Sequence, residues 1–392
     1  MVQGREENGK LIITLTGKID SSNANLVGAG IQALRHQYPC ESIILDCEKL
    51  DYSSSAGLRV ILRLTQEVED TVLINVNSEL YNILDLTGFT EMMEIHRAYR
   101  VLSVEGCEVI GQGANGKIYR IDADTILKVY YDEDALPEID RSRELSRLAF
   151  ISGIPTAIPY DVVRIEGGGY GSVFELLNAT SFAKLIIDGE KTPDEAAEMS
   201  IDLLKLIHSK HVHSDILPDM KAVALDWAGF LKDYLPAEQF DKLYSLIDAV
   251  PADEHLVHGD YHLKNVMLQN GESLLIDMDT LCHGHPIFEL ASMYNAYEGY
   301  SLVNHDQTLA FLGIPYDVCC AFWRRCLELY LGTQDRERLD EVEAKAKIVG
   351  LTRVMRREIR RNGLNREDGR ALIEACRSNL AELLSKTDTL LF

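Results

Sequence analysis

The stretch that decides the fold of most of this 392-residue chain is His258–Asp279, HGDYHLKNVMLQNGESLLIDMD. Short apolar runs flank Asn270–Gly271, a dipeptide that strongly favours a two-residue β-hairpin turn. The hairpin would bring Asp277 back beside Asn265, while Asp260 precedes the first strand. Carboxylate and amide oxygens gathered with little balancing charge are typical of a site for divalent cations that bridge phosphate groups. Each residue alone could instead cap a turn or end a strand, but the three in this order favour function.

A glycine-rich stretch lies upstream, where Gly111, Gly113 and Gly116 form a GxGxxG pattern. A dinucleotide-binding fingerprint requires a helix after the glycines. Here the segments KIYRI and TILKVY alternate like strands, so the glycines are predicted to cap a β-hairpin. That geometry is typical of a kinase glycine-rich loop over ATP phosphates, although a hairpin without a ligand is the alternative.

Lys128 follows in the strand-like ILKV, where a kinase lysine reaches the α and β phosphates of ATP. A solvated lysine is the simpler interpretation of such a residue taken alone. Glu144, in the helical IDRSRELSRLAF, is the candidate carboxylate that would fix the Lys128 ammonium. Glu138 is a weaker candidate because it falls at the expected start of that helix.

The segments HGDYHLKN, LLIDMD and GHPIFELA occur in this order and resemble the motifs of the aminoglycoside phosphotransferase family, which also includes choline, homoserine and sugar kinases. The resemblance covers about residues 105–300. It implies that Asp260 is the catalytic residue acting on the attacking hydroxyl and that Asn265 and Asp277 bind Mg²⁺. Two departures are Glu289, which replaces the usual aspartate, and His285, which replaces the aspartate often found before proline.

The same resemblance identifies VFELLNATS as the hinge between two lobes, with the backbone of Glu175 and Leu177 meeting adenine. An ordinary buried strand is an equal alternative. Beyond the motifs, the aromatic residues of DWAGFLKDYL are expected to be core residues, and the basic stretch TRVMRREIRRNG is expected to be a solvated helix face.

The first hundred residues have a different character, because short β-rich runs alternate with apolar residues at helical spacing. This alternation predicts an α/β unit. Its LDYSSSAGLRVIL segment places three serines at a helix start, where a serine caps the first-turn N–H groups or, alternatively, a phosphate binds them. The segment resembles the STAS domains of anti-sigma factor antagonists, and aligning Gly57-Leu58 with that family places its regulatory phosphoserine at Ser55. Ser54 stands where that family often has aspartate.

Net charge, apolar content and cysteine spacing each argue against certain classes of function and partner. The formal charge of -23 argues against nucleic acid as a partner, because phosphates require Lys and Arg. The N-terminus has no apolar signal region and no window approaches 18 uncharged apolar residues, so we expect a cytoplasmic protein without membrane contact. The eight cysteines lack CxxC or Cys/His metal spacing, which favours reduced structural thiols.

Together these features predict an α/β STAS-like regulatory domain at residues 1–103 and an α+β two-lobed protein-kinase-like domain of the aminoglycoside phosphotransferase type at 104–392. Its N-lobe would span about 104–178 and its C-lobe about 179–392. The predicted activity is transfer of the ATP γ-phosphoryl group, with Mg²⁺, to a hydroxyl of an aminoglycoside, sugar or amino alcohol, and the STAS domain would take a protein partner. The alternatives are a non-catalytic interaction protein with a degenerate kinase fold, or a serine/threonine protein kinase.

Overall fold

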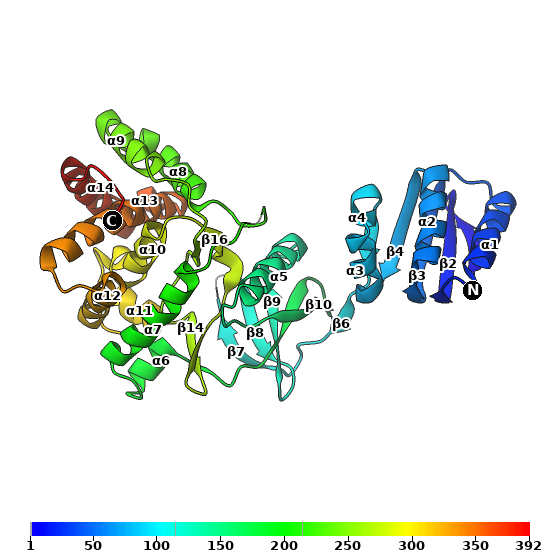
Figure 1. Cartoon of the computed structure of the whole chain (residues 1–392), viewed down its shortest axis with the longest axis horizontal. Coiled ribbons are helices and arrows are strands. Elements are labelled where there is room, and N and C mark those ends of the chain that lie inside the picture. Colours follow the sequence, from blue (N-terminus) through cyan, green and yellow to red (C-terminus); the bar gives the residue numbers. More distant parts are fainter. Residues whose placement is uncertain (1, 114, 214) are drawn as a thin grey trace. The chain divides into compact units, whose positions relative to one another are not determined.

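The computed structural model describes residues 2–113, 115–213 and 215–392. The chain divides into two compact units (Figure 1). The first comprises residues 1–107, 129–133 and 162–171, and the second comprises 108–128, 134–161 and 172–392.

A five-stranded sheet with the order β1-β2-β3-β4-β5 forms the centre of the first unit. β1 pairs with β2 in antiparallel fashion, and the other neighbours are parallel. Alternate residues of β2, such as Leu11, Ile13 and Leu15, are buried, which is the period expected of a strand with one face on a core. The strands are β1 Val2–Glu7, β2 Lys10–Ile19, β3 Ser42–Ser53, β4 Asp70–Val76 and β5 Ile95–Arg97.

Four helices connect these strands: α1 Ala24–Gln37, α2 Ser55–Glu67, α3 Ser78–Leu86 and α4 Phe89–Met92. α1 packs against α2, and α3 packs against α4 (Figure 1). The predicted alternation of strands and helices is confirmed. β3 extends to Ser53, because its second half continues to pair with β2 beyond a bulge.

The sheet that follows contains the glycine-rich hairpin. Its strands are β6 Arg100–Leu102, β7 Glu108–Gln112, β8 Gly116–Arg120, β9 Thr125–Tyr130, β10 Pro159–Ile165 and β11 Tyr170–Glu175, in the order β6-β10-β11-β9-β8-β7. β7 and β8 pair antiparallel, which confirms that the glycines cap a hairpin. β6 pairs in parallel with residues 163–165 of β10.

Helices dominate the rest of the second unit (Figure 1). They are α5 Leu136–Ile151, α6 Phe182–Ile187, α7 Pro193–His208, α8 Met220–Phe230, α9 Ala237–Asp248, α10 Ile287–Tyr297, α11 Asp306–Leu312, α12 Tyr316–Leu331, α13 Arg336–Arg360 and α14 Glu367–Lys386. α7 starts with a capping box, in which Thr192 and Glu195 each bond the other's backbone N–H. No helix within the described ranges is long and apolar enough to cross a membrane.

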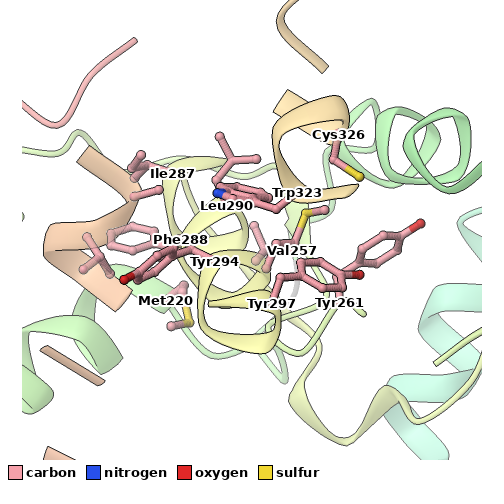
Figure 2. Packing of buried hydrophobic residues seen from close by; sticks show 14 of the residues in the cluster. Met220, Val257, Tyr261, Ile287, Phe288, Leu290, Tyr294, Tyr297, Trp323 and Cys326 are labelled. Atoms are coloured by element: carbon pink, nitrogen blue, oxygen red, sulfur yellow. The ribbon is translucent and has the colours of Figure 1, made fainter. Parts of the chain in front are cut away.

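α10 is the centre of the largest core, because every one of its residues is buried. Figure 2 shows Phe288, Leu290 and Tyr294 of α10 among Met220 of α8 and Trp323 of α12. This packing fixes α10 directly behind the HGD segment, whose preceding strand β13 (Leu256–Val257) belongs to the same core. The helical core therefore supports the backbone from which the candidate site residues project.

The decisive hairpin forms as predicted. β14 (Val266–Gln269) pairs antiparallel with β15 (Glu272–Leu275), with Val266 opposite Leu275. Asn270 and Gly271 both have positive φ, 52° and 85°, as a type I′ turn requires. β12 (Thr180–Ser181) adds a third strand to this small sheet, and β13 pairs with β16 (Cys282–His283).

Candidate active site

The HGD loop follows β13 and turns sharply at Gly259, whose φ is +80°. A Cβ at this position would lie 2.8 Å from the carbonyl oxygen of Thr280, so both the conformation and the space favour glycine. The loop is held from below by Glu289 of α10. Its fully buried carboxylate accepts hydrogen bonds from the backbone N–H groups of His258 and Gly259.

The Glu289 carboxylate is charged despite this burial. Burial raises its pKa, but the imidazole of His208, with Nε2 3.9 Å from the carboxylate, the charge of His258 and the Gly259 N–H outweigh burial and lower the pKa overall. Glutamate here replaces the aspartate expected from the motif, and its longer side chain still reaches two adjacent N–H groups of the loop.

Asp260 presents its side chain to solvent, with 44% of it exposed. Nε2 of His262 lies 3.4 Å from Oδ2, and a guanidinium nitrogen of Arg353 lies 4.0 Å from Oδ1. Partial burial opposes ionisation, but the hydrogen bond and charge of His262, with Arg353 and His258, lower the pKa of Asp260 to about 2. Asp260 is therefore a carboxylate at neutral pH and a weak base, suited to accepting a hydrogen bond from a hydroxyl.

Arg353, on α13, is a site residue that the sequence analysis missed. Its guanidinium donates to the carbonyl oxygen of Gly259 at 2.9 Å and to Ser292 Oγ at 3.2 Å, and it stacks over Trp227 at 5.2 Å from the ring centroid. The expectation that the whole basic stretch is a solvated face is wrong at this residue. Arg353 lies 94 positions from Gly259, so no local sequence signal could have linked them.

Lys128, on β9, meets two carboxylates that follow β15. Its ammonium lies 3.0 Å from Asp279 and 3.8 Å from Asp277. Ser142 of α5 donates a hydrogen bond to the other oxygen of Asp279. Burial raises the pKa of Asp277, and the neighbouring Asp279 adds to this, although Lys128 opposes it. The pKa of Asp279 is lowered overall, because Lys128 and Ser142 outweigh its burial.

The structure does not bring Glu144 to Lys128, so the predicted pairing of these two residues is wrong. Glu144 is exposed on α5 and forms no ion pair with Lys128 within the described part of the chain. The register of α5 explains this, because Ser142, Leu145 and Ser146 are the residues of that turn that face inward. Asp279 takes the place that Glu144 was expected to fill.

Asn265 lies next to the carboxylate pair. Its side-chain amide donates to the carbonyl oxygen of Asp260 at 3.0 Å, and its backbone carbonyl accepts from Ile276, the residue before Asp277, at 2.9 Å. One hydrogen of the NH₂ group is thereby engaged, and the amide oxygen is a group that can coordinate a cation or accept a hydrogen bond. Two carboxylates that share one lysine, close in the fold to a residue with an amide oxygen, offer the ligand types of a hard divalent cation, whose charge would relieve the repulsion between the carboxylates.

The glycine loop is closed by a hydrogen bond from Gly113 N–H to the Gly116 carbonyl, 2.9 Å long. Gly111 lies in β7, and Gly116 begins β8; position 114, within the loop, lies outside the described residues. Asn115 donates to Glu138 in the first turn of α5 at 2.9 Å, so the loop is tied to that helix. Glu138, the weaker candidate for Lys128, therefore has a different partner.

The two residues predicted to lie at a hinge, Glu175 and Leu177, also have defined positions. Glu175 is exposed at the end of β11, and Leu177 is half-buried in the irregular segment that leads to β12. The preceding residue, Leu176, donates its N–H to the carbonyl of Asp124 at 2.7 Å.

The serines of the first unit have distinct positions at the start of α2. Ser54 is the N-cap, and its hydroxyl accepts from Ala56 N–H at 3.2 Å. Ser55 is the first helical residue and is exposed. Gly57 permits close packing of α2 on β2 and β3, because a Cβ at this position would clash with Ser53 Oγ and lie 2.7 Å from Ile19 Cγ2.

The sequence model described as the phosphotransferase enzyme family matches residues 106–312, more than half of the chain. The chain belongs to this family. The STAS domain model matches residues 1–101, so the chain joins a STAS domain to a phosphotransferase domain. Both predicted families are thereby confirmed.

Two curated relatives match the STAS domain. The anti-sigma F factor antagonist of Paenibacillus polymyxa is 26% identical over 99 residues, covering 24% of this chain and 85% of the relative. The putative anti-sigma factor antagonist BtrV of Bordetella bronchiseptica is 29% identical over 92 residues, covering 22% and 78%.

Solved structures similar to this member of the phosphotransferase family include an ADP-bound aminoglycoside phosphotransferase APH(2'')-Ib, with 18% identity, a TM-score of 0.45, and coverage of 71% of this chain and 91% of that one. A choline/ethanolamine kinase family protein from Mesorhizobium loti has 15% identity and a TM-score of 0.45, covering 72% and 88%. A thermostable mutant of aminoglycoside phosphotransferase APH(4)-Ia, in a ternary complex with ADP and hygromycin B, has 11% identity and a TM-score of 0.48, covering 72% and 95%.

Proposed function

We propose that the phosphotransferase domain transfers the γ-phosphoryl group of ATP to a hydroxyl of a small molecule of the aminoglycoside, sugar or amino alcohol class. The observation that carries this proposal is the convergence of Lys128, Asp277 and Asp279 beside the Asn265–Asp260 hydrogen bond. A lysine that contacts two carboxylates suits a nucleotide with its metal, and Asp260 adds an exposed carboxylate for the acceptor.

Each residue has a role in this scheme. Lys128 and the loop bearing Gly111, Gly113 and Gly116 hold the phosphates, and the backbone of Glu175 and Leu177 meets adenine. Asp260 accepts a hydrogen bond from the acceptor hydroxyl and aims its oxygen at the γ-phosphorus. The new O–P bond forms as the bond between the γ-phosphorus and the bridging oxygen breaks, ADP leaves, and the hydroxyl proton passes to phosphate or solvent. Catalysis is then mainly positioning and charge neutralisation.

Asn265 and Asp277 would hold Mg²⁺, with Asp279 fixed between Lys128 and Ser142 as the neighbour that orients the lysine. When bound, the metal neutralises the developing charge on the phosphate oxygens. The chain's own residues prepare this position, because the Lys128 ammonium pairs with both adjacent carboxylates and its single positive charge faces their two negative ones.

The acidic character of the chain, with a formal charge of -23, is compatible with a cationic acceptor such as an amino sugar or an amino alcohol.

Two alternative functions would use the same fold differently: a non-catalytic protein that acts through STAS contacts, and a protein kinase. The buried, hydrogen-bonded support of the HGD loop by Glu289 and Arg353 favours an active phosphotransferase, because a degenerate site would need no such positioning.

The deciding experiment is ATP turnover by the purified protein, measured as ADP release, with a panel of aminoglycosides, sugars, amino alcohols and protein substrates. We expect stimulation by one small-molecule class and none by proteins. In parallel, ATP with Mg²⁺ should raise the melting temperature, and ATP with EDTA should do so much less. Absence of any shift with millimolar ATP, ADP or GTP would reject nucleotide binding and the proposal with it.

A further inference from the structure

A cluster of two histidines and one aspartate lies outside the proposed phosphoryl-transfer site. His211, Asp253 and His255 each offer a ligand atom, and these atoms lie within 4.8 Å of one another. We propose that this cluster binds a transition-metal dication such as Zn²⁺ and joins the segment after α7 to the segment that leads into the HGD loop. The inference goes beyond the proposed function and shares no residue with the ATP and Mg²⁺ groups.

Backbone contacts already align the two segments. His211 and His255 form an antiparallel β-bridge, and the flanking bonds are Val212 N–H to the Glu254 carbonyl at 3.2 Å and Leu256 N–H to the Lys210 carbonyl at 2.9 Å. The two imidazole rings lie 4.2 Å apart between centroids. A short two-strand ladder therefore sets both rings side by side, so little conformational entropy is lost when they share an ion.

Asp253 is oriented by contacts of the kind that surround metal ligands. One carboxylate oxygen accepts from the His255 backbone N–H at 3.0 Å and contacts the ring Nδ1 of His255, so an ion that takes the place of the proton between them would meet both groups. Nδ1 of His283 lies 2.9 Å from the Asp253 carbonyl oxygen. Such outer hydrogen bonds fix ligand orientation in metal sites.

The ligand chemistry selects the class of ion. Two imidazole nitrogens and one carboxylate suit Zn²⁺ and its first-row neighbours, whereas Mg²⁺ and Ca²⁺ prefer sites made of oxygen. Zinc ligands lie about 2.0–2.2 Å from the ion, so two ligands of a tetrahedral site are roughly 3.3–3.6 Å apart. The most distant pair of the cluster thus needs to close by up to about 1.5 Å. His211 is exposed, which gives the ion access and lets its side chain make that adjustment.

Because the cluster lies next to β13, a bound ion would affect the backbone that leads into the HGD turn. His255 directly precedes β13, and β13 leads into His258 and the HGD turn. A bound ion would add a link between this strand and the end of α7, beside the β13–β16 pairing. We therefore expect metal binding to slow amide exchange at residues 255–258 as well as at 210–212.

The test is a Zn²⁺ titration of the full-length chain, stripped with a chelator, in excess Mg²⁺ and without nucleotide. We expect one Zn²⁺ per chain. His211→Ala should weaken Zn²⁺ binding by about 100-fold, because losing a residue that merely orients a ligand already weakens metal binding by up to that factor. Asp253→Asn should also weaken it. His36→Ala, which removes an exposed histidine of the first unit, is the matched control and should bind like the wild type.

Co²⁺ provides a second measurement that distinguishes this site from the free thiols. Binding at the cluster should give visible ligand-field bands without thiolate charge-transfer absorption, and His211→Ala should lose those bands. Absence of stoichiometric Zn²⁺ binding, equal Zn²⁺ affinity in His211→Ala and wild type, or a thiolate spectrum for Co²⁺ would each overturn the proposal. Because no nucleotide is used, these outcomes do not depend on the proposed phosphoryl transfer.

Discussion

At the scale of single residues, the site divides into groups for the acceptor and groups for the nucleotide. The Asp260 side chain is exposed and is paired with His262. Asp277 lies 3.8 Å from the Lys128 ammonium and follows Ile276, whose N–H bonds the Asn265 carbonyl. A substitution of either aspartate should therefore affect different steps of the proposed reaction.

We expect Asp260→Asn to reduce phosphoryl transfer by about 10²- to 10⁴-fold while leaving the affinity for Mg-ATP unchanged, because its role is confined to the hydroxyl. Asp277→Asn should weaken Mg-ATP binding as well as transfer, through lost metal affinity. Calorimetric titration with Mg-ATP and ADP-release kinetics measure the two effects. Wild-type activity in either variant would contradict the assigned roles.

The depressed pKa of Asp260 predicts a specific pH dependence of stability. Its ordinary value is 3.8 and its folded value is about 2, so the ionised carboxylate stabilises the fold fully above about pH 4. That contribution is lost as the pH falls through 2. The difference in melting temperature between wild type and Asp260→Asn should therefore be constant from pH 7 to about 5 and shrink below pH 4. A difference that is already lost between pH 7 and 6 would contradict the assignment of this contribution to Asp260.

At the scale of elements, α10 and α13 act as the support of the HGD loop. Glu289 of α10 binds its N–H groups and Arg353 of α13 binds its Gly259 carbonyl, so both polarities of the loop backbone are satisfied. The start of α2 in the first unit also has backbone N–H groups that need acceptors, and the Ser54 hydroxyl accepts a hydrogen bond from one of them as the N-cap.

Arg353→Ala should lower transfer by roughly 10- to 100-fold, since hydrogen bonds to charged groups are worth about 1.5–3 kcal/mol and position the loop that carries Asp260. Arg356→Ala is the matched control on the same helix, because Arg356 pairs with exposed Asp226 and lies near Phe230. Its activity should stay near that of the wild type. Equal losses in both variants would point to a general effect on α13.

Ser54→Ala should destabilise the start of α2 by about 1 kcal/mol, the usual cost of removing a serine cap. Amide exchange in the first turns of α2 should then be about fivefold faster, as mass spectrometry of peptides from residues 53–67 can measure. Ser55→Ala serves as the control and should change exchange little, because its side chain is exposed. The reverse ranking of the two variants would mean that Ser55 is the true cap.

At the scale of the whole molecule, the STAS and phosphotransferase domains share one chain, which keeps a serine-bearing module at high effective concentration beside the other domain. We propose that the STAS domain, residues 1–103, regulates the enzyme through a protein partner or a separate kinase acting at Ser55. Phosphate there would add about -1.5 to -2 charges at a helix N-terminus that accepts them, and it would repel an acidic partner.

Incubation with labelled ATP followed by peptide mapping should therefore leave Ser55 unlabelled. Stoichiometric label on Ser55 that is lost in Asp260→Asn would establish phosphorylation in cis instead. Deletion of residues 1–98, which spares β6 and its pairing with β10, should change the rate of transfer. A truncated protein with unaltered kinetics would argue against both forms of coupling.

The sequence by itself determined the two families, the α/β character of the first unit, the hairpin around Asn270–Gly271 and the glycine-capped hairpin. These features depend on periodicity, turn chemistry and short motifs, which are local and therefore legible in the order of residues. The closeness of Asp277 to Asn265 followed from the same local reasoning, because the two lie on paired strands of one hairpin.

Only the tertiary structure decided which carboxylate meets Lys128 and which cation meets Asp260. Asp279 displaced Glu144 because the register of α5 turns Ser142 inward, and Arg353 reaches the HGD loop from a helix far along the chain. The cluster of His211, Asp253 and His255 also arises from a β-bridge between distant segments. Such pairings are set by how helices and strands pack around the α10 core, and no short window of sequence contains that information.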